Sequence, residues 1–227
     1  MPTIGVTEAE YKKAVTVFAS APWPCLPAPE DEEELARSVT AQGFRHVIVG
    51  AQPYRKTLYE ALTRGGVIAR FGVGHDNIDK AAATRAGLLC TNTPGVLDQS
   101  VLEHTLVLLL AAARRLVELA GDVRAGRWAS IPACEVAGKT LAIVGCGSIG
   151  REVARAATRG LRMRVVGVET RYLDPVWLRE EYGFSEVYPQ LAPALEQADF
   201  VSLHVPGGPS TRHLINANSL KRFRPHA

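Results

Sequence analysis

The most constraining feature of the sequence is a glycine-rich turn between an apolar run and a helical pattern, LAIVGCGSIG at residues 141–150. The apolar run predicts a buried strand over 140–145. Three glycines follow it with the G-x-G-x-x-G spacing: Gly145, Gly147 and Gly150. The first permits a tight turn, the second lets the backbone approach a ligand, and the third lets the next helix pack against the strand. The turn therefore predicts a parallel α/β unit with a ligand site at the carboxyl end of its strand.

The residues around this turn indicate which ligand it binds. The free amides of Ser148 and Ile149 begin the predicted helix and would face a phosphate group. Glu169 ends the next strand pattern, nineteen residues after Gly150, where an acidic side chain accepts hydrogen bonds from the adenine ribose. Its charge would repel the 2′-phosphate of NADP, so the pattern predicts NAD. Arg171, two residues further on, could bind a 2′-phosphate, but it is interpreted as a solvated loop cation.

Composition excludes several classes of protein. The net charge of +3 is too small and too scattered for nucleic-acid binding, and Lys221, Arg222 and Arg224 are interpreted as a solvated helix end. The most apolar stretch, 106–113, is far shorter than the ~20 residues that cross a bilayer, so it predicts a buried helix and no membrane span. The cysteines lack metal-ligand spacing, so they predict no metal site but reduced, mostly buried thiols of a cytoplasmic protein: Cys25, Cys90, Cys134 and Cys146.

Strand and helix patterns alternate through the first ninety residues. VTVFAS predicts a first strand at Val15–Phe18. The prolines after it predict an irregular loop: Pro22, Pro24, Pro27 and Pro29. Further strands are predicted at 46–50, 67–72 and 88–90, and helices at 31–43, 54–66 and 77–87. Strict alternation implies parallel strands with helices on both faces.

A second series follows a hinge predicted at 91–100. Ser100 and Glu103 fit a capping box that opens one long helix, 101–119, which Gly121 closes. Strands are then predicted at 140–145, 164–169, 186–188 and 199–205, with helices at 149–159, 175–182 and 191–197. The sequence therefore predicts two α/β domains, residues 1–99 and 100–227.

Several longer motifs occur in a fixed order between about residues 45 and 225. They read RFGVGHDNIDKAAATRAG, TNTPGV, VLEHTLVLLLAAARR and GRW, then GKTLAIVGCGSIGREVA and ADFVSLHVPGGPSTRHLIN. In this order they resemble the D-isomer-specific 2-hydroxyacid dehydrogenase family. The resemblance implies NAD-dependent oxidoreduction that interconverts a 2-hydroxy acid and a 2-oxo acid. It also implies a flavodoxin-like substrate-binding domain, a Rossmann NAD-binding domain with the active site between them, and a homodimer.

The resemblance also assigns residues to the site. It places the substrate carboxylate on the backbone amides of Val73 and Gly74, in a turn that would need positive φ at Gly72 and Gly74. Cofactor contacts are implied on the long helix and after the last strand: Thr105, His204, Val205, Pro206 and Thr211. For Thr105, a hydroxyl bond to its own helix backbone is an alternative. His75 departs from the family pattern beside the carboxylate turn, which leaves its role open.

The side chains that the resemblance assigns to catalysis are not in this sequence. After a segment like LKRFRPHA, residues 220–227, the family continues into an N-x-x-R-G motif whose arginine holds the substrate. A glutamate and a histidine that handle the hydroxyl proton come later still. We therefore assign no catalytic residue here and expect a truncated enzyme that is inactive as it stands. The alternative is a non-catalytic NAD-binding module like the corepressors that resemble these enzymes. The sequence does not specify which 2-oxo acid is the substrate.

Overall fold

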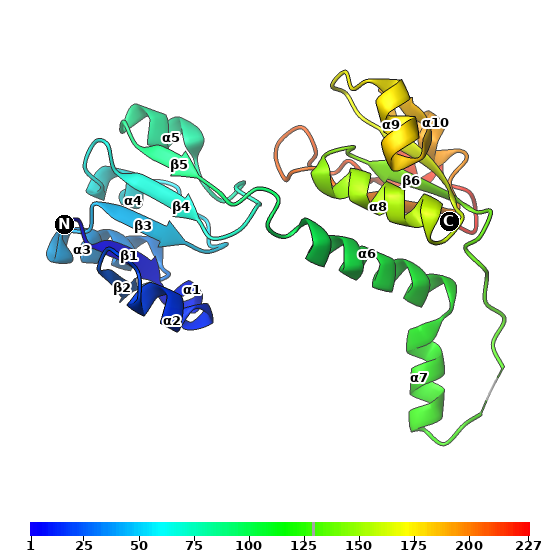
Figure 1. Cartoon of the computed structure of the whole chain (residues 1–227), viewed down its shortest axis with the longest axis horizontal. Coiled ribbons are helices and arrows are strands. Elements are labelled where there is room, and N and C mark those ends of the chain that lie inside the picture. The colour runs from blue at the N-terminus through cyan, green and yellow to red at the C-terminus, as the bar shows by residue number, and fades with distance from the viewer. Residues whose placement is uncertain (129) are drawn as a thin grey trace. The chain divides into compact units, whose positions relative to one another are not determined.

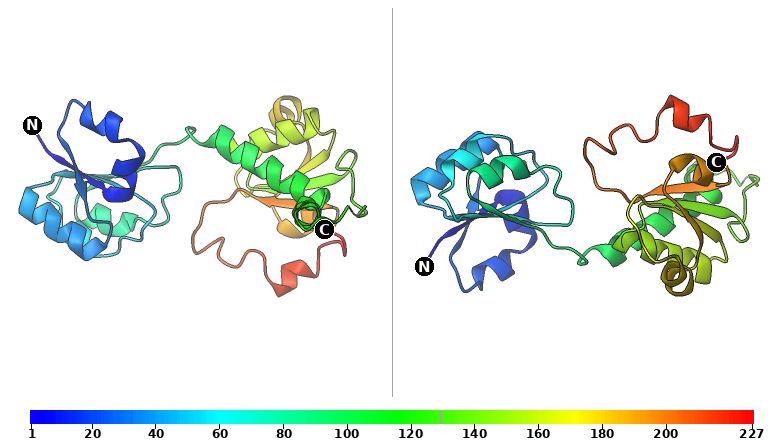
Figure 2. Two further views of the ribbon diagram at one scale, coloured as in Figure 1. Left: turned by 90° about the horizontal axis from the view of Figure 1, so that it is seen from below. Right: turned by 90° about the horizontal axis from the view of Figure 1, so that it is seen from above.

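The computed structural model describes residues 1–128 and 130–227, and the chain divides into two compact units, Met1–Val96 and Leu97–Ala227 (Figure 1). Each unit contains one parallel sheet with helices packed against it, and Figure 2 shows helices on both sides of each sheet. The predicted α/β class is confirmed for both.

The first unit contains a five-stranded parallel sheet in the order β2-β1-β3-β4-β5. Its strands are β1 (Ile4–Thr7), β2 (Cys25–Ala28), β3 (His46–Val49), β4 (Val67–Arg70) and β5 (Leu89–Thr91). This order is that of flavodoxin-like folds, in which the order of strands across the sheet reverses between the first and third strands. The flavodoxin-like prediction is therefore confirmed.

Five helices pack around this sheet: α1 (Glu8–Lys13), α2 (Val15–Ala19), α3 (Glu32–Gln42), α4 (Thr57–Ala61) and α5 (Lys80–Arg85). The ends of α3 follow from its sequence. The Asp31 carboxylate accepts hydrogen bonds from the amides of Glu33 and Glu34, and Gly43 ends the helix with a φ of 66°. One face of α3 is buried: Leu35 of this helix lies in the same hydrophobic core as Val47 of β3. That burial, rather than helix propensity, fixes its place.

Two predictions for the N-terminal region are wrong. Val15–Phe18 forms a helix instead of a strand, because only Phe18 of the run is buried, where it stacks on Tyr11 at 5.5 Å. The proline-rich loop contains β2, in which Pro27 pairs with Val6. A proline is tolerated there because β2 is the outermost strand, so the missing amide need not bond a further neighbour.

The second unit contains a four-stranded parallel sheet in the order β8-β7-β6-β9. Its strands are β6 (Thr140–Val144), β7 (Arg164–Val168), β8 (Phe184–Tyr188) and β9 (Phe200–Leu203). This is the order of the first four strands of a Rossmann sheet, 3-2-1-4 when counted along the unit. All five β6 residues are buried, as the apolar run predicts.

The helices of this unit are α6 (Asp98–Ala113), α7 (Leu116–Arg124), α8 (Ser148–Arg159), α9 (Pro175–Tyr182), α10 (Leu191–Leu195) and α11 (Ala217–Leu220). One face of the sheet packs against α6, α8 and α9 through residues such as Leu102, Val153 and Leu178. The other face packs against α10 through Ala194. The sheet thus lies between two layers of helices, as a parallel sheet requires.

The predicted single helix 101–119 is wrong in three respects. The helix begins at Asp98, so Ser100 lies inside it and forms no capping box. It breaks at Arg115, whose φ is 51°, and Gly121 lies within α7 rather than closing a helix. The 106–113 stretch is also not fully buried, because Val107 and Leu108 are 59% and 56% exposed. No described helix is long and apolar enough to span a membrane.

Two further expectations about side chains are met only in part. The four cysteines are free, but only Cys146 is fully buried, while Cys90 and Cys134 are exposed. Lys221 and Arg222 are exposed as expected, whereas Arg224 is partly buried, and both arginines form ion pairs. Arg222 pairs with Glu196 at 2.9 Å, and Arg224 pairs with Asp199 at 2.9 Å.

Candidate dinucleotide and carboxylate sites

The predicted cofactor turn lies where β6 and β9 end side by side. These are the strands between which the chain order reverses, and ligands of open α/β sheets bind at that edge. Gly145 has a φ of 97°, and a Cβ placed on it would lie 2.6 Å from the His204 carbonyl oxygen. The His204 amide in turn donates to the Val144 carbonyl at 2.7 Å. The turn and the end of β9 are therefore packed backbone to backbone, which only glycine allows.

The other two glycines of the turn differ in what surrounds them. A Cβ on Gly150 would overlap the carbonyl oxygen of Gly145, so this glycine lets α8 approach β6. Gly147, by contrast, has an ordinary φ of −69° and nothing within 4 Å of an added Cβ. Neither backbone strain nor packing within the described chain requires a glycine at position 147. The open space in front of it is what a close-approaching ligand needs.

The start of α8 has the donors for an anion. Gly147 is its N-cap residue and supplies no side chain, so the helix has no side-chain cap. The first amides of a helix have no partner inside it, which leaves those of Ser148 and Ile149 free to donate. Together with the space at Gly147, these amides fit the pyrophosphate of a dinucleotide.

Glu169 lies at the end of β7 and is already bound to Arg171. The Arg171 backbone amide and Nε donate to one carboxylate oxygen at 3.1 and 3.2 Å, and its Nη2 donates to the other at 2.9 Å. These bonds hold the pKa of Glu169 below its usual value. Arg171 is a solvent-exposed loop cation, as interpreted, with its side chain 69% exposed, but it also forms an ion pair with the residue expected to bind the ribose.

Arg151 is a functional candidate that the sequence patterns did not indicate. It lies in the first turn of α8 and donates from Nη1 to the Cys146 carbonyl at 3.1 Å. Its guanidinium packs over the rings of Trp177, at 5.1 Å, and Tyr182, at 5.4 Å. Only its position directly after Gly150 could have drawn attention to it, because the two aromatic partners come from α9.

The residues after β9 form the second wall of the turn. His204 lies at the strand end with Nε2 2.9 Å from the Ser202 hydroxyl, and partial burial lowers its pKa. Val205 contacts the region of Gly145. The Thr211 hydroxyl donates to the Pro206 carbonyl at 2.7 Å and thereby closes the loop. His204 and Val205 thus lie against the turn, and Pro206 and Thr211 follow them in the loop.

Thr105 lies on α6, and its hydroxyl donates to the Val101 carbonyl at 2.7 Å. This is the alternative role that its sequence allows. The hydroxyl oxygen can still accept a hydrogen bond from a ligand, but its proton is engaged.

The predicted carboxylate turn follows β4 in the first unit. Gly72 has a φ of 140°, whereas Gly74 is not in the positive-φ region, so the expectation of positive φ at both is wrong. The Val73 carbonyl accepts a hydrogen bond from the Asn92 side chain at 2.8 Å, which fixes the turn. In the described part of the chain, the backbone amides of Val73 and Gly74 donate no hydrogen bond. They are available to a carboxylate. Sequence reasoning missed Asn92, although it lies in the TNTPGV motif.

His75 borders a cavity of about 230 Å³ beside this turn, which also includes Lys80, Cys90 and Asn92. Its Nδ1 is buried without a partner among the residues described.

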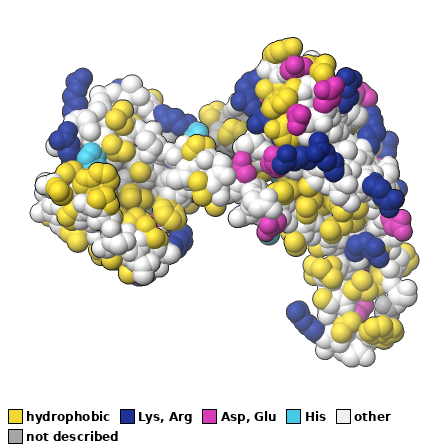
Figure 3. Space-filling model, viewed as in Figure 1, with side chains coloured by type: hydrophobic (Ala, Val, Ile, Leu, Met, Phe, Trp, Pro, Cys, Tyr) yellow, Lys and Arg dark blue, Asp and Glu magenta, His cyan; other side chains and the backbone are white. Residues whose placement is uncertain are grey.

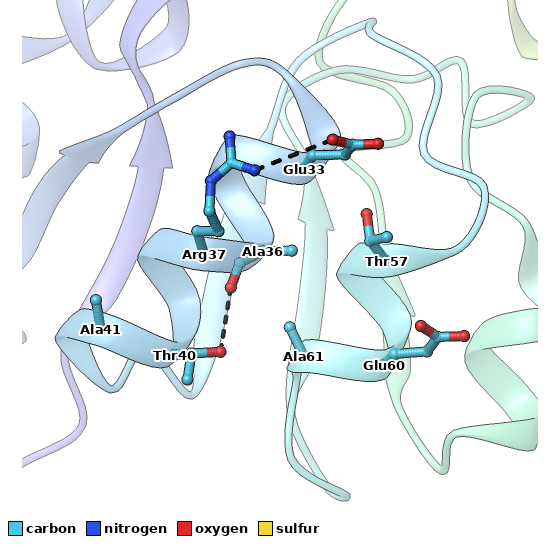
Figure 4. Close-up of a pocket in the computed structure, with 8 residues that line it drawn as sticks. All are labelled: Glu33, Ala36, Arg37, Thr40, Ala41, Thr57, Glu60 and Ala61. Carbon is cyan, nitrogen blue, oxygen red and sulfur yellow. Dashed lines mark hydrogen bonds and ion pairs between the residues drawn. The ribbon is translucent and has the colours of Figure 1, made fainter.

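A different groove of about 630 Å³ lies between α3 and α4 (Figure 4). It contains none of the residues predicted for the site, and its sides are mostly small or charged: Glu33, Ala36, Arg37, Thr40, Ala41, Thr57, Glu60 and Ala61.

Comparison with known proteins identifies the family. Residues 106–227 match the model of the D-isomer specific 2-hydroxyacid dehydrogenase NAD-binding domain, which is more than half of the chain. The chain belongs to the D-isomer-specific 2-hydroxyacid dehydrogenases. As a member of this oxidoreductase family it has a nicotinamide dinucleotide as its cofactor. The turn at Gly145–Gly150 lies inside the matched domain.

Individual relatives agree with this assignment. The glyoxylate reductase of Korarchaeum cryptofilum is 39% identical over 76% of this chain and 52% of its own length. That of Thermococcus kodakarensis is 32% identical over 100% of this chain and 70% of its own. The structure of Rhodotorula graminis D-mandelate dehydrogenase has a TM-score of 0.80 at 23% identity, covering 99% of this chain and 71% of that one, which shows a common fold. The chain thus spans between 52% and 71% of the length of these three relatives.

Proposed function

We propose that this protein is part of an NAD-dependent oxidoreductase that interconverts a small D-2-hydroxy acid and the corresponding 2-oxo acid. The single observation that carries the proposal is the uncapped start of α8 with open space at Gly147, which fits a dinucleotide pyrophosphate. A bound nicotinamide would supply or accept the hydride. The amides of Val73 and Gly74 would hold the substrate carboxylate, and relatives named glyoxylate reductase and hydroxypyruvate reductase favour a short side chain.

We assign the remaining site residues by the same reasoning. Cofactor contacts are proposed for Thr105, Gly145, Gly147, Ser148, Ile149, Gly150, Glu169, His204, Val205, Pro206 and Thr211. His204 is proposed as a wall of the cofactor path rather than an acid, because its imidazole is partly buried and bonded to Ser202, and a lowered pKa disfavours its protonated form. A cytoplasmic location is proposed from the four free cysteines.

We further propose that the protein is a homodimer. The residues that support it are exposed apolar side chains of α6 and α7, here named the α6–α7 surface: Val107, Leu108, Leu110, Leu116, Val117 and Val123. The helix α7 buries none of its own residues. Figure 3 shows apolar side chains gathered over these two helices. Apolar patches of this kind mark sites of association.

The proposal is tested by binding and by turnover. Residues 1–227 should bind NADH in a fluorescence titration, because the amides and glycines of the turn are present. They should oxidise no NADH with glyoxylate, hydroxypyruvate or pyruvate, because residues 1–227 do not contain the arginine, glutamate and histidine that the family resemblance assigns to catalysis. Acid–base groups alone contribute ~10²–10⁴-fold to the rate. The Korarchaeum cryptofilum glyoxylate reductase is the positive control. Absence of NADH binding would contradict the cofactor assignment, and rates like the control would require His75 or His204 as the acid.

A further inference from the structure

The turn between β6 and α8 is held at Cys146 from two sides. The Cys146 side chain is fully buried, with Sγ 3.8 Å from the Val168 carbonyl oxygen. A Cβ on Gly167 would lie 2.7 Å from this Sγ, so the thiol packs directly against the backbone of β7. On the other side, Arg151 donates from Nη1 to the Cys146 carbonyl at 3.1 Å. Both the side chain and the carbonyl of Cys146 are therefore fixed.

The bond to the Cys146 carbonyl also sets the direction of the next amide. Because the Cys146–Gly147 peptide group is planar and trans, the Gly147 N–H points away from this carbonyl and hence away from Arg151. Among the described residues, the Gly147 amide donates no hydrogen bond. It is therefore available to a ligand, together with the amides of Ser148 and Ile149.

Arg151 is in turn held in place by α9. Its guanidinium lies 5.1 Å from the ring centroid of Trp177 and 5.4 Å from that of Tyr182, and the two rings pack edge to face at 5.1 Å. A guanidinium is attracted to aromatic rings at such distances. A long side chain that would otherwise sample many rotamers is thereby restricted to the one that reaches Cys146.

Stability of the fold does not by itself explain this arginine. Its Nε is buried and has no hydrogen-bond partner among the described residues, and an unpartnered buried donor lowers stability. Arg155, one turn later on α8, also lies over Tyr182, at 5.8 Å, but its guanidinium bonds to Glu152 instead of the turn. The bond from Arg151 to the turn is therefore the contact that a functional role explains.

We propose that Arg151 is a positioning residue for the dinucleotide. Clamped by the rings of α9, it holds the Cys146–Gly147 peptide group so that the amides at the start of α8 face the pyrophosphate. Helix α9, which contains none of the residues predicted for the site, thereby contributes to cofactor binding. This inference rests on the proposed function, since it concerns the pyrophosphate end of the same dinucleotide site.

The first experiment is a fluorescence titration of the parent chain and its variants with NADH. Arg151→Ala should raise the NADH dissociation constant at least about tenfold, the value of one hydrogen bond to a charged group. Arg151→Lys should also bind NADH more weakly than the parent, because a compact ammonium group lacks the planar fork that bonds the carbonyl while it packs on the rings. Trp177→Leu removes one ring of the clamp and should weaken binding by about threefold in the parent, but not further in Arg151→Ala.

A second measurement separates positioning from general stability. In the amide NMR spectrum of the ligand-free chain, the Gly147 resonance should shift or broaden in Arg151→Ala, while the resonances of the buried strand β7 stay in place. The matched control is Arg155→Ala, which removes a cation from the same helix and the same ring. It should change neither the NADH dissociation constant nor the Gly147 resonance.

Parent-like NADH binding by Arg151→Ala, or an unchanged Gly147 resonance, would overturn the inference alone. Parent-like binding by Arg151→Lys would overturn it by showing that Arg151 acts only through its charge. A lower melting temperature with unchanged affinity would overturn it in favour of a purely structural role. Trp177→Leu provides the same test if Arg151→Ala does not fold. Failure of the parent chain to bind NADH would overturn the inference together with the proposed function.

Discussion

Single residues of the cofactor turn can be separated into those that the fold needs and those that a ligand needs. Gly145 and Gly150 are packed against backbone atoms of the chain itself, so any side chain there forces the backbone to move. Gly147 faces open space with an ordinary φ. The same motif thus contains two glycines required for packing and one whose role requires a bound molecule.

Exchange of Gly147 for alanine should therefore affect binding without affecting stability. The added methyl group would extend into the space in front of the helix start and keep a pyrophosphate away from the amides. We expect Gly147→Ala to weaken NADH binding by at least about tenfold, because hydrogen bonds to a charged group are each worth ~1.5–3 kcal/mol. The melting temperature should stay close to that of the parent. The readouts are a fluorescence titration and a thermal melt.

The matched variant is Gly150→Ala, which should destabilise the protein by roughly 1–3 kcal/mol because its methyl group overlaps the Gly145 carbonyl. Equal NADH affinity in Gly147→Ala and the parent would show that no ligand approaches this residue.

Hydroxyl and charged side chains near the turn show what sequence cannot give at this scale. The sequence allowed the bond from the Thr105 hydroxyl to its own helix, but it did not indicate that the Thr211 hydroxyl donates to the Pro206 carbonyl. Arg171 is solvent-exposed as expected, but its ion pair with Glu169 was not indicated by the sequence. Each of these bonds depends on side-chain rotamers, which residue spacing does not specify.

Among the elements, β6, β9 and the C-terminal segment are joined by one buried carboxylate. Asp199, directly before β9, accepts a hydrogen bond from the Thr140 amide of β6 at 2.8 Å. Its other oxygen accepts from Arg224 and His226, each at 2.9 Å. Burial would raise the pKa of Asp199, but the hydrogen bonds from His226, Thr140 and Arg224 outweigh it and lower the pKa to about 2.

This carboxylate should make the protein sensitive to acid. Because the pKa is lower in the folded than in the unfolded chain, ionised Asp199 stabilises the fold above about pH 4, and the stabilisation is lost as the pH falls toward 2. We expect Asp199→Asn to lower the unfolding free energy at pH 7 by about 1–2 kcal/mol and to flatten its decline between pH 4 and 2. Denaturant titrations at several pH values measure both effects.

The control for this prediction is Asp174→Asn. Asp174 caps α9 through its carboxylate, and asparagine caps a helix equally well. An Asp199→Asn variant with the same acid limb as the parent would contradict the assignment of this acid sensitivity to Asp199.

At the same scale, elements with a repeated pattern were predictable and isolated ones were not. The helix at α3 and the strands β6 and β7 follow from caps, glycines and apolar runs. The first strand, Ile4–Thr7, was missed because it is short, and the apolar run at Val15–Phe18 took its place. The break between α6 and α7 occurs at Arg115, a residue that favours helix, so no sequence signal marks it.

For the whole molecule, the sequence predicts two α/β sheets because many alternating elements agree, but it does not distinguish a buried apolar helix from an exposed one. The run at 106–113 was expected to be buried, whereas the α6–α7 surface exposes large side chains, with Val117 80% exposed. Both a core and an interface need apolar residues at helical spacing. The sequence therefore cannot separate a core helix from an interface helix, whereas the structure shows which apolar side chains are exposed to solvent.

Substitution on the α6–α7 surface should separate the proposed homodimer into single chains. Val117→Lys places a charge in an apolar interface, where an unpaired charge is costly, so the dimer dissociation constant should rise at least about tenfold. The matched control is Val17→Lys on α2, also an exposed valine, 63% exposed, which should leave the dimer intact. Sedimentation velocity distinguishes the 24.5 kDa chain from its dimer. Because Val117 contacts solvent in the single chain, the melting temperature of the separated chains should not fall below that of the diluted parent. A parent protein that sediments as a single chain at all concentrations, or a Val17→Lys variant that dissociates as readily as Val117→Lys, would refute the assignment of the dimer to this surface.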